Sequence, residues 1–123
     1  MKAIGKKTWL LSNMYWPEVT SPGTYVSHES VCALNISNKD CIVTLDLYYE
    51  DHEPITGLTA VCDAQRTHHI RMDQLLDSDK KHIPCGVAYA AVVTCSVPCV
   101  VQYTRVDTMQ SENALMTTLG YGI

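Results

Sequence analysis

Polar side chains at the ends of apolar segments are the residues of this sequence best suited to chemistry. In the stretch QYTRVD, residues 102–107, an apolar run ends in amide, hydroxyl, guanidinium and carboxylate groups. Buried polar groups are costly unless they are matched, so we expect part of this set to line a cleft for a polar ligand or a partner. The candidate binding residues are His28, Glu29, Arg66, His69, Gln102, Thr104, Arg105, Asp107 and Asn113.

Arg105 and Asp107 are two residues apart, so in a strand they share one face. The planar guanidinium of arginine binds carboxylates and hydroxyl groups with fixed geometry. Two interpretations are open for this pair. It presents its charges to a ligand or a neighbouring chain, or it forms an intrachain latch that closes the fold.

The histidines and serines form no recognisable metal or catalytic motif. His68 and His69 are adjacent and point to opposite faces of a strand, and the segment from His28 lacks the second His of H-E-x-x-H. Structural histidines are favoured over a metal site assembled from His28, Glu29 and His69. Consecutive strand residues, such as those from Ser27 to Glu29, cannot align as a catalytic triad. We therefore predict no catalytic residue, no metal site and no cofactor.

The six cysteines are expected to be structural free thiols. The sequence has no C-x-x-C, and the nearest pair, Cys95 and Cys99, is separated by SVP within strand-like sequence. Reduced cysteine behaves as a small buried hydrophobe. Zinc binding or a disulfide is the alternative.

The elements that must position these residues are predominantly β-strands. The clearest is 40–50, where Cys41, Val43, Leu45, Leu47 and Tyr49 form one apolar face with a period of two. Further strands are expected at 7–12, 25–36 (interrupted at 28–30), 57–62, 66–71, 87–94 and 100–106, with Pro98 at a bulge or edge. Short helical turns are expected at 72–76 and 110–117, and the final TLGYGI is unassigned.

This pattern indicates an all-β fold. Roughly seven or eight short strands, with turns about every 8–12 residues, are typical of a β-sandwich or a β-barrel. The chain has 123 residues, of which 46% are hydrophobic and 18% charged, which suits one globular domain spanning residues 1–123.

Net charge and hydropathy argue against nucleic acid as a partner and against a membrane location. Nine basic and thirteen acidic residues give a net charge of -4, which makes nucleic-acid binding a poor hypothesis. No apolar run approaches the roughly 18 residues of a membrane span, and the apolar stretch at 9–11 is too short for a signal peptide. We expect a cytoplasmic protein.

Four segments carry a family resemblance: SHESVCALN (27–35), YYEDHEP (48–54), QRTHHIRMDQL (65–75) and VPCVVQYTRVDTMQSENALMTT (97–118). They resemble the sensory rhodopsin transducer family, named for the small soluble partner of a cyanobacterial sensory rhodopsin. The resemblance covers nearly the whole chain in the right order and is weak only in the segment through Gly23.

The resemblance implies an antiparallel β-sandwich of the jelly-roll or carbohydrate-binding-module type and a homo-oligomer, expected to be a tetramer. It also implies a non-enzymatic cytoplasmic adaptor that couples a receptor, such as a membrane photoreceptor, to downstream components. The alternative is a module of the same fold, without a rhodopsin partner, that binds a small polar molecule. A sugar or polyol is the expected ligand, because Arg, Asp, Asn, Gln and His beside Tyr and Trp suit hydroxyl-rich molecules.

Overall fold

The computed structural model describes residues 2–18, 20–23 and 25–123. Within these ranges the chain forms eight strands and one short 3-10 turn, and all strand pairs are antiparallel. The elements are β1 (Lys6–Met14), β2 (His28–Asn35), β3 (Cys41–Tyr49), β4 (Ile55–Cys62), β5 (Arg66–Arg71), η1 (Met72–Gln74), β6 (Tyr89–Asp107), β7 (Ala114–Leu119) and β8 (Tyr121–Gly122). The predicted all-β antiparallel class is confirmed.

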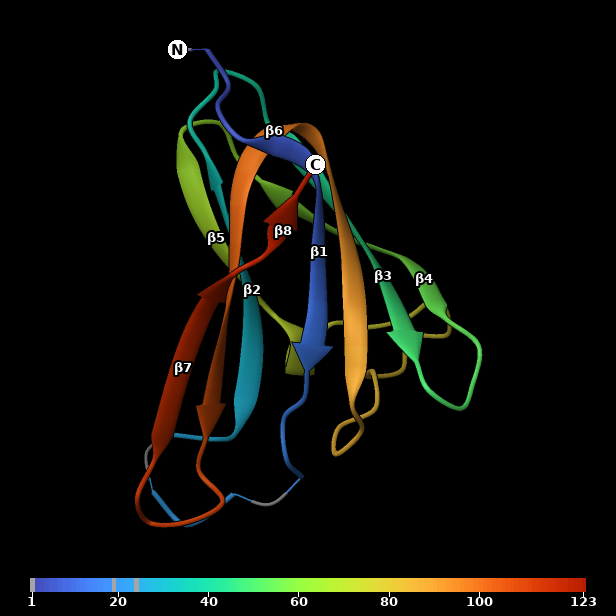
Figure 1. The fold of residues 1–123 in the computed structure, drawn as a ribbon, viewed down its shortest axis with the longest axis vertical. Helices are drawn as coiled ribbons and strands as arrows, with labels where there is room; N and C mark the ends of the chain where they lie inside the picture. Colours follow the sequence, from blue (N-terminus) through green and yellow to red (C-terminus); the bar gives the residue numbers. More distant parts are fainter. Residues whose placement is uncertain (1, 19, 24) are drawn as a thin grey trace.

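Strand β6 belongs to both halves of the hydrogen-bonded network. Its first arm, residues 89–95, lies between β1 and β3 in the order β4-β3-β6-β1-β8. Its second arm, residues 100–107, lies between β2 and β7, with β5 beyond β2. Figure 1 shows β6 rising on one side, arching over at the end that carries the N-terminus, and descending on the other side. The finer jelly-roll arrangement stays a prediction.

The arch of β6 corrects the expectation of two separate strands at 87–94 and 100–106. The ladder between β1 and β6 passes from Thr8–Thr94 directly to Lys6–Cys99, so β6 carries extra residues there, and Pro98 lies among them. The Trp9 indole N–H closes the arch by donating to the carbonyl of Cys99 at 3.0 Å. The prediction of a bulge at Pro98 is confirmed, but the strand continues through it.

Two other expectations were wrong. The expected interruption at 28–30 is absent, because β2 begins at His28 and pairs continuously with β6 from that residue. The expected helix at 110–117 is instead the turn before β7 and most of that strand. Residues 110–117 include good helix formers, but pairing with β6 supplies a ladder of backbone hydrogen bonds that outweighs this weak local preference.

The core follows the period of two that the sequence shows. Cys41, Val43, Leu45 and Leu47 of β3 are fully buried, and Tyr49 is half-buried at the end of the strand. Buried residues from both halves of the network form one cluster. The short helical turn expected at 72–76 is η1, and TLGYGI contains the end of β7 and all of β8.

Gly5 is the glycine on which the arch depends. Its φ is +126°, and a Cβ built there lies 2.0 Å from the carbonyl oxygen of Cys99. Gly57 has a φ of +75°, and apart from its chain neighbours no described residue comes within 4 Å of a Cβ placed there. We expect Gly57→Ala to cost about 1–2 kcal/mol from backbone strain alone, and Gly5→Ala to cost about 1–3 kcal/mol more from the clash. Urea unfolding measures both, and equal losses would contradict the close approach at the arch.

Candidate functional site

A buried carboxylate at the start of β2 is the centre of the polar network. Glu29 is completely buried, and its carboxylate accepts hydrogen bonds from the Tyr15 backbone N–H (3.0 Å), the Tyr89 hydroxyl (2.9 Å) and the Arg105 Nε (3.0 Å). Glu29 and Arg105 lie directly opposite each other in the β2–β6 ladder. Cross-strand register therefore places the two charges in contact.

Arg105 and Asp107 do not form the intrachain latch that was one of the two open interpretations. Arg105 forms its ion pair with Glu29, whereas Asp107 accepts a hydrogen bond from the backbone N–H of Met109 at 2.9 Å. An aspartate that bonds the backbone two residues ahead stabilises a turn, here the one that follows β6. The intrachain interpretation thus holds for Arg105, but with a different partner.

The carbonyl of Asn13 ties β1 to the second arm of β6. It accepts hydrogen bonds from the Tyr103 hydroxyl (2.7 Å) and from Arg105 Nη2 (3.4 Å). The same arginine therefore holds both the carboxylate on β2 and the backbone of β1. This geometry positions the end of β1 relative to the strands around it.

Burial raises the pKa of Glu29, and the hydrogen bonds from Tyr15, Arg105 and Tyr89 oppose this shift. Burial and the neighbouring Glu29 carboxylate also raise the pKa of Tyr89. Tyr89 therefore stays protonated, and its hydroxyl donates a hydrogen bond to the Glu29 carboxylate. With three donors on one carboxylate, Glu29 is fully engaged within the protein.

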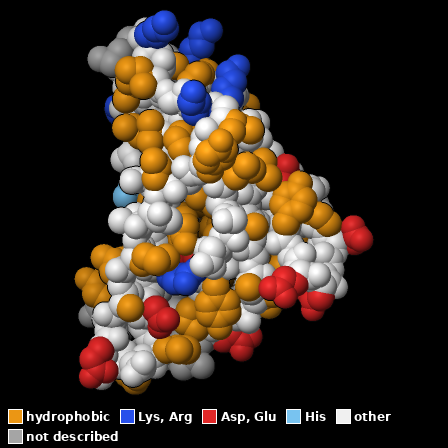
Figure 2. Space-filling view, viewed as in Figure 1, with side chains coloured by type: hydrophobic (Ala, Val, Ile, Leu, Met, Phe, Trp, Pro, Cys, Tyr) orange, Lys and Arg blue, Asp and Glu red, His pale blue; other side chains and the backbone are white. Residues whose placement is uncertain are grey.

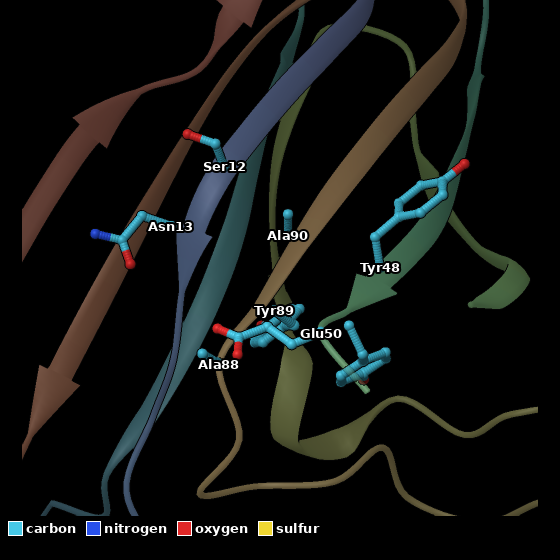
Figure 3. Close-up of a pocket in the computed structure, with 8 residues that line it drawn as sticks. Ser12, Asn13, Tyr48, Glu50, Ala88, Tyr89 and Ala90 are labelled. Carbon is cyan, nitrogen blue, oxygen red and sulfur yellow. The ribbon is translucent and has the colours of Figure 1, made fainter. Parts of the chain in front are cut away.

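An open depression of about 330 Å³ adjoins this network. It exists because β1 bulges: the ladder passes from Leu11–Ala91 to Met14–Tyr89, which leaves one extra residue on β1. Figure 3 shows Ser12 and Asn13 of β1 on one side of Ala90 and Tyr48 of β3 on the other. The pocket is lined by Ser12, Asn13, Tyr48, Tyr49, Glu50, Ala88, Tyr89 and Ala90.

An aromatic stack connects this pocket with the core. Tyr49 stacks on His52 with ring centroids 4.1 Å apart and on Tyr89 at 5.9 Å, and Tyr89 meets Trp16 edge to face at 5.8 Å. Tyr89 thus belongs to both the ion-pair network and the pocket. Burial raises the pKa of Tyr49 to about 12, and its buried hydroxyl has no hydrogen-bond partner among the described residues. A ligand hydroxyl or amide is the kind of group that would satisfy it.

Charge is unevenly distributed around the pocket. Glu50, Asp51 and Glu53 are exposed at the end of β3 and just beyond it. Figure 2 shows Asp and Glu toward this end, together with one basic side chain, and most of the visible Lys and Arg toward the end that carries the N-terminus. The pocket therefore favours neutral or cationic groups over phosphates and carboxylates.

The nine predicted site residues do not converge on one place. Glu29 and Arg105 form the network above, while His69 and Gln102 flank Cys32 across neighbouring strands. The other members lie apart: Thr104 donates to Thr117, His28 bonds the Val26 carbonyl, and Arg66 and Asn113 line two separate depressions. Their role in binding stays a prediction.

Several pocket residues were missed as site candidates. Tyr48, Tyr49 and Glu50 lie in YYEDHEP, and Tyr89 lies in an apolar strand, where the alternating pattern marks it as core. Ser12 and Asn13 lie at a bulge that no residue type signals. The usable signal was the polar tip of each buried tyrosine, which requires a partner.

Metal-ligating residues come close together at one place in the described chain. The Sγ atoms of Cys41, Cys95 and Cys99 all lie within 4.8 Å of one another, whereas His28, Glu29 and His69 form no such group. All six cysteines, each in a described segment, are free thiols. The histidine–glutamate metal site considered from the sequence is therefore not assembled.

The described segments contain no helix with the length and apolar character needed to cross a membrane.

The fold and the site define an all-β antiparallel protein with a polar pocket beside a buried ion pair. Residues 4–122 match the family model described as Anabaena sensory rhodopsin transducer, and the chain belongs to that family. The predicted family is confirmed, and the match includes most of the segment before Gly23 that resembles the family weakly.

Solved structures agree with this membership. The one described as Anabaena sensory rhodopsin transducer is 37% identical, with a TM-score of 0.74, and the match covers 89% of this chain and 96% of that one. The structure of Thermotoga maritima 1070 is 28% identical, with a TM-score of 0.83 and coverage of 97% and 96%. No curated protein sequence matches the chain.

The ion pair yields a pH-dependent prediction. Arg105→Ala leaves Glu29 buried without its cation, and we expect a loss of about 2–4 kcal/mol at neutral pH, since the arginine side chain is only 21% exposed. Removing Arg105 raises the pKa of Glu29 further. The folded variant then binds a proton more tightly than the unfolded chain, so the loss shrinks as pH falls through the raised pKa.

Urea unfolding at neutral and mildly acidic pH measures this effect. In the Glu29→Gln/Arg105→Ala double variant, which carries no ionisable group at this pair, the added pH dependence should vanish. An equal loss from Arg105→Ala at both pH values would show that Glu29 does not depend on Arg105.

Proposed function

We propose that this protein is a non-enzymatic, cytoplasmic signal-transduction adaptor that couples a membrane receptor to downstream components. The observation that carries the proposal is family membership over residues 4–122, with 37% identity to the solved Anabaena sensory rhodopsin transducer. The site supports a binding role, because the buried carboxylate is held by three donors rather than poised beside a nucleophile. A membrane photoreceptor is the expected class of receptor.

The proposal includes a single β-sandwich domain, residues 1–123, that assembles as a homotetramer. The joint core of the two halves sharing β6 supports the sandwich. For assembly, the supporting feature is β7, in which all six residues are exposed. Among the described residues, β7 pairs only with β6. An exposed apolar edge strand offers unpaired backbone groups and apolar side chains to a second copy.

The experiment that tests the adaptor role is capture from membranes of the source cell with the immobilised protein. We expect one membrane receptor to be enriched, and native mass spectrometry of the same preparation to show a tetramer. Leu115→Glu/Leu119→Glu places charge on two side chains that are 72% and 57% exposed on β7, and it should reduce the tetramer to smaller species.

The matched control is Val61→Glu on β4, where the wild-type side chain is 51% exposed and should lie outside the assembly. An intact tetramer that enriches no receptor would overturn the adaptor role. A wild-type monomer would overturn the assembly.

A second candidate function is binding of a small neutral polyol or sugar in the pocket beside Glu29. The observation that favours it is a pocket lined by the hydroxyl, amide and carboxylate residues Ser12, Asn13 and Glu50. Tyr49 also lines this pocket, and its hydroxyl has no hydrogen-bond partner among the described residues. Tyr48 faces solvent near the end of β3 and adds an aromatic surface of the kind that packs against sugar rings.

Thermal unfolding against a panel of sugars and polyols tests this function. A ligand at about 100 times its dissociation constant should add roughly 2.7 kcal/mol. Tyr49→Phe should raise the stability of the free protein by about 1 kcal/mol, because a buried unpaired hydroxyl is removed, and should weaken the ligand shift. Arg66→Ala, outside the pocket, should keep the shift. A Tyr49→Phe variant that loses stability would contradict the partnerless hydroxyl.

A further inference from the structure

The arch of β6 brings together cysteines that a straight strand would separate. Cys95 and Cys99 are four residues apart, which corresponds to about 13 Å along a regular strand. In the arch, the Sγ atoms of Cys95, Cys99 and Cys41, the first residue of β3, all lie within 4.8 Å of one another. Three sulfur ligands therefore converge from two strands at the end of the sheet.

The three sulfurs are shielded from water. Cys41 and Cys99 are fully buried, and Cys95 is 1% exposed. Burial and the neighbouring cysteine sulfurs raise the pKa of Cys95 to about 12 and raise that of Cys99 as well. Cys95 and Cys99 are thus neutral thiols in the free protein.

A fourth buried cysteine, Cys62, has its thiol hydrogen-bonded to other strands. The Cys62 thiol donates to the carbonyls of Arg66 at 3.3 Å and Ala33 at 3.6 Å, on β5 and β2. Zinc almost always takes four ligands in structural sites, whereas this group offers three sulfurs. Calcium and magnesium require oxygen ligands. A soft ion that accepts three-coordination among sulfurs fits best, and Cu(I) is such an ion.

We propose that Cys41, Cys95 and Cys99 bind one Cu(I) ion. Each copper–thiolate bond replaces a thiol proton, which is released to water, and no electron is transferred. The arch itself forms the outer wall: a depression of about 310 Å³ above it is lined by Ala3, Ser37, Asn38, Lys39, Val97 and Pro98. Once bound, the ion joins the arch of β6 to the start of β3.

Competition with a chromophoric Cu(I) chelator, on reduced protein without oxygen, tests this site. We expect one Cu(I) per chain, the emission typical of solvent-shielded copper–thiolate sites, and a higher midpoint of thermal unfolding. Cys95→Ala and Cys99→Ala should each lose stoichiometric binding. Cys62→Ala, equally buried and on the neighbouring strand, is the matched control and should keep it.

X-ray absorption of the copper-loaded wild-type protein tests the same assignment without a variant, in case the alanine variants fold poorly. Three sulfur neighbours around copper are expected. The proposal is overturned by nitrogen or oxygen neighbours, by less than half an equivalent of bound copper, by binding that survives Cys95→Ala/Cys99→Ala, or by loss of binding in Cys62→Ala.

Discussion

The continuity of β6 is the constraint on which the rest of the structure depends. One strand of 19 residues pairs with β1 and β3 along its first arm and with β2 and β7 along its second. Its bend requires a glycine at position 5, an indole N–H on the Cys99 carbonyl and a proline where no ladder partner is needed. The two halves share a core because this strand leaves one and enters the other.

The polar network lies at the opposite end of the arms, where a second connection between the halves is needed. Arg105 on the second arm contacts both Glu29 on β2 and the Asn13 carbonyl on β1, and Tyr89 on the first arm donates to the same carboxylate. Ligand in the adjoining pocket would touch residues of this network directly.

The features that follow local patterns were predictable. The faces of β3 and the bounds of β5 follow from a period of two and from turn residues. The long-range features were not. The helix-forming residues at 110–117 do not indicate that part of this segment pairs with the edge of β6. Pro98 marks a bulge but does not indicate that the strand continues beyond it. Arg105 was expected to bind a ligand, a neighbouring chain or Asp107, but its observed partner, Glu29, depends on the β2–β6 register. The pocket includes a β1 bulge that has no signature in residue types.

Native-state hydrogen exchange of the β6 amides tests the central claim most directly. If one continuous strand holds both halves together, Ala91 and Val93 on the first arm and Val101 and Tyr103 on the second should exchange through a single opening, with the same free energy and the same denaturant dependence. Two arms that open independently, each with its own free energy, would show that the halves are separate units joined by a linker, and would contradict the account.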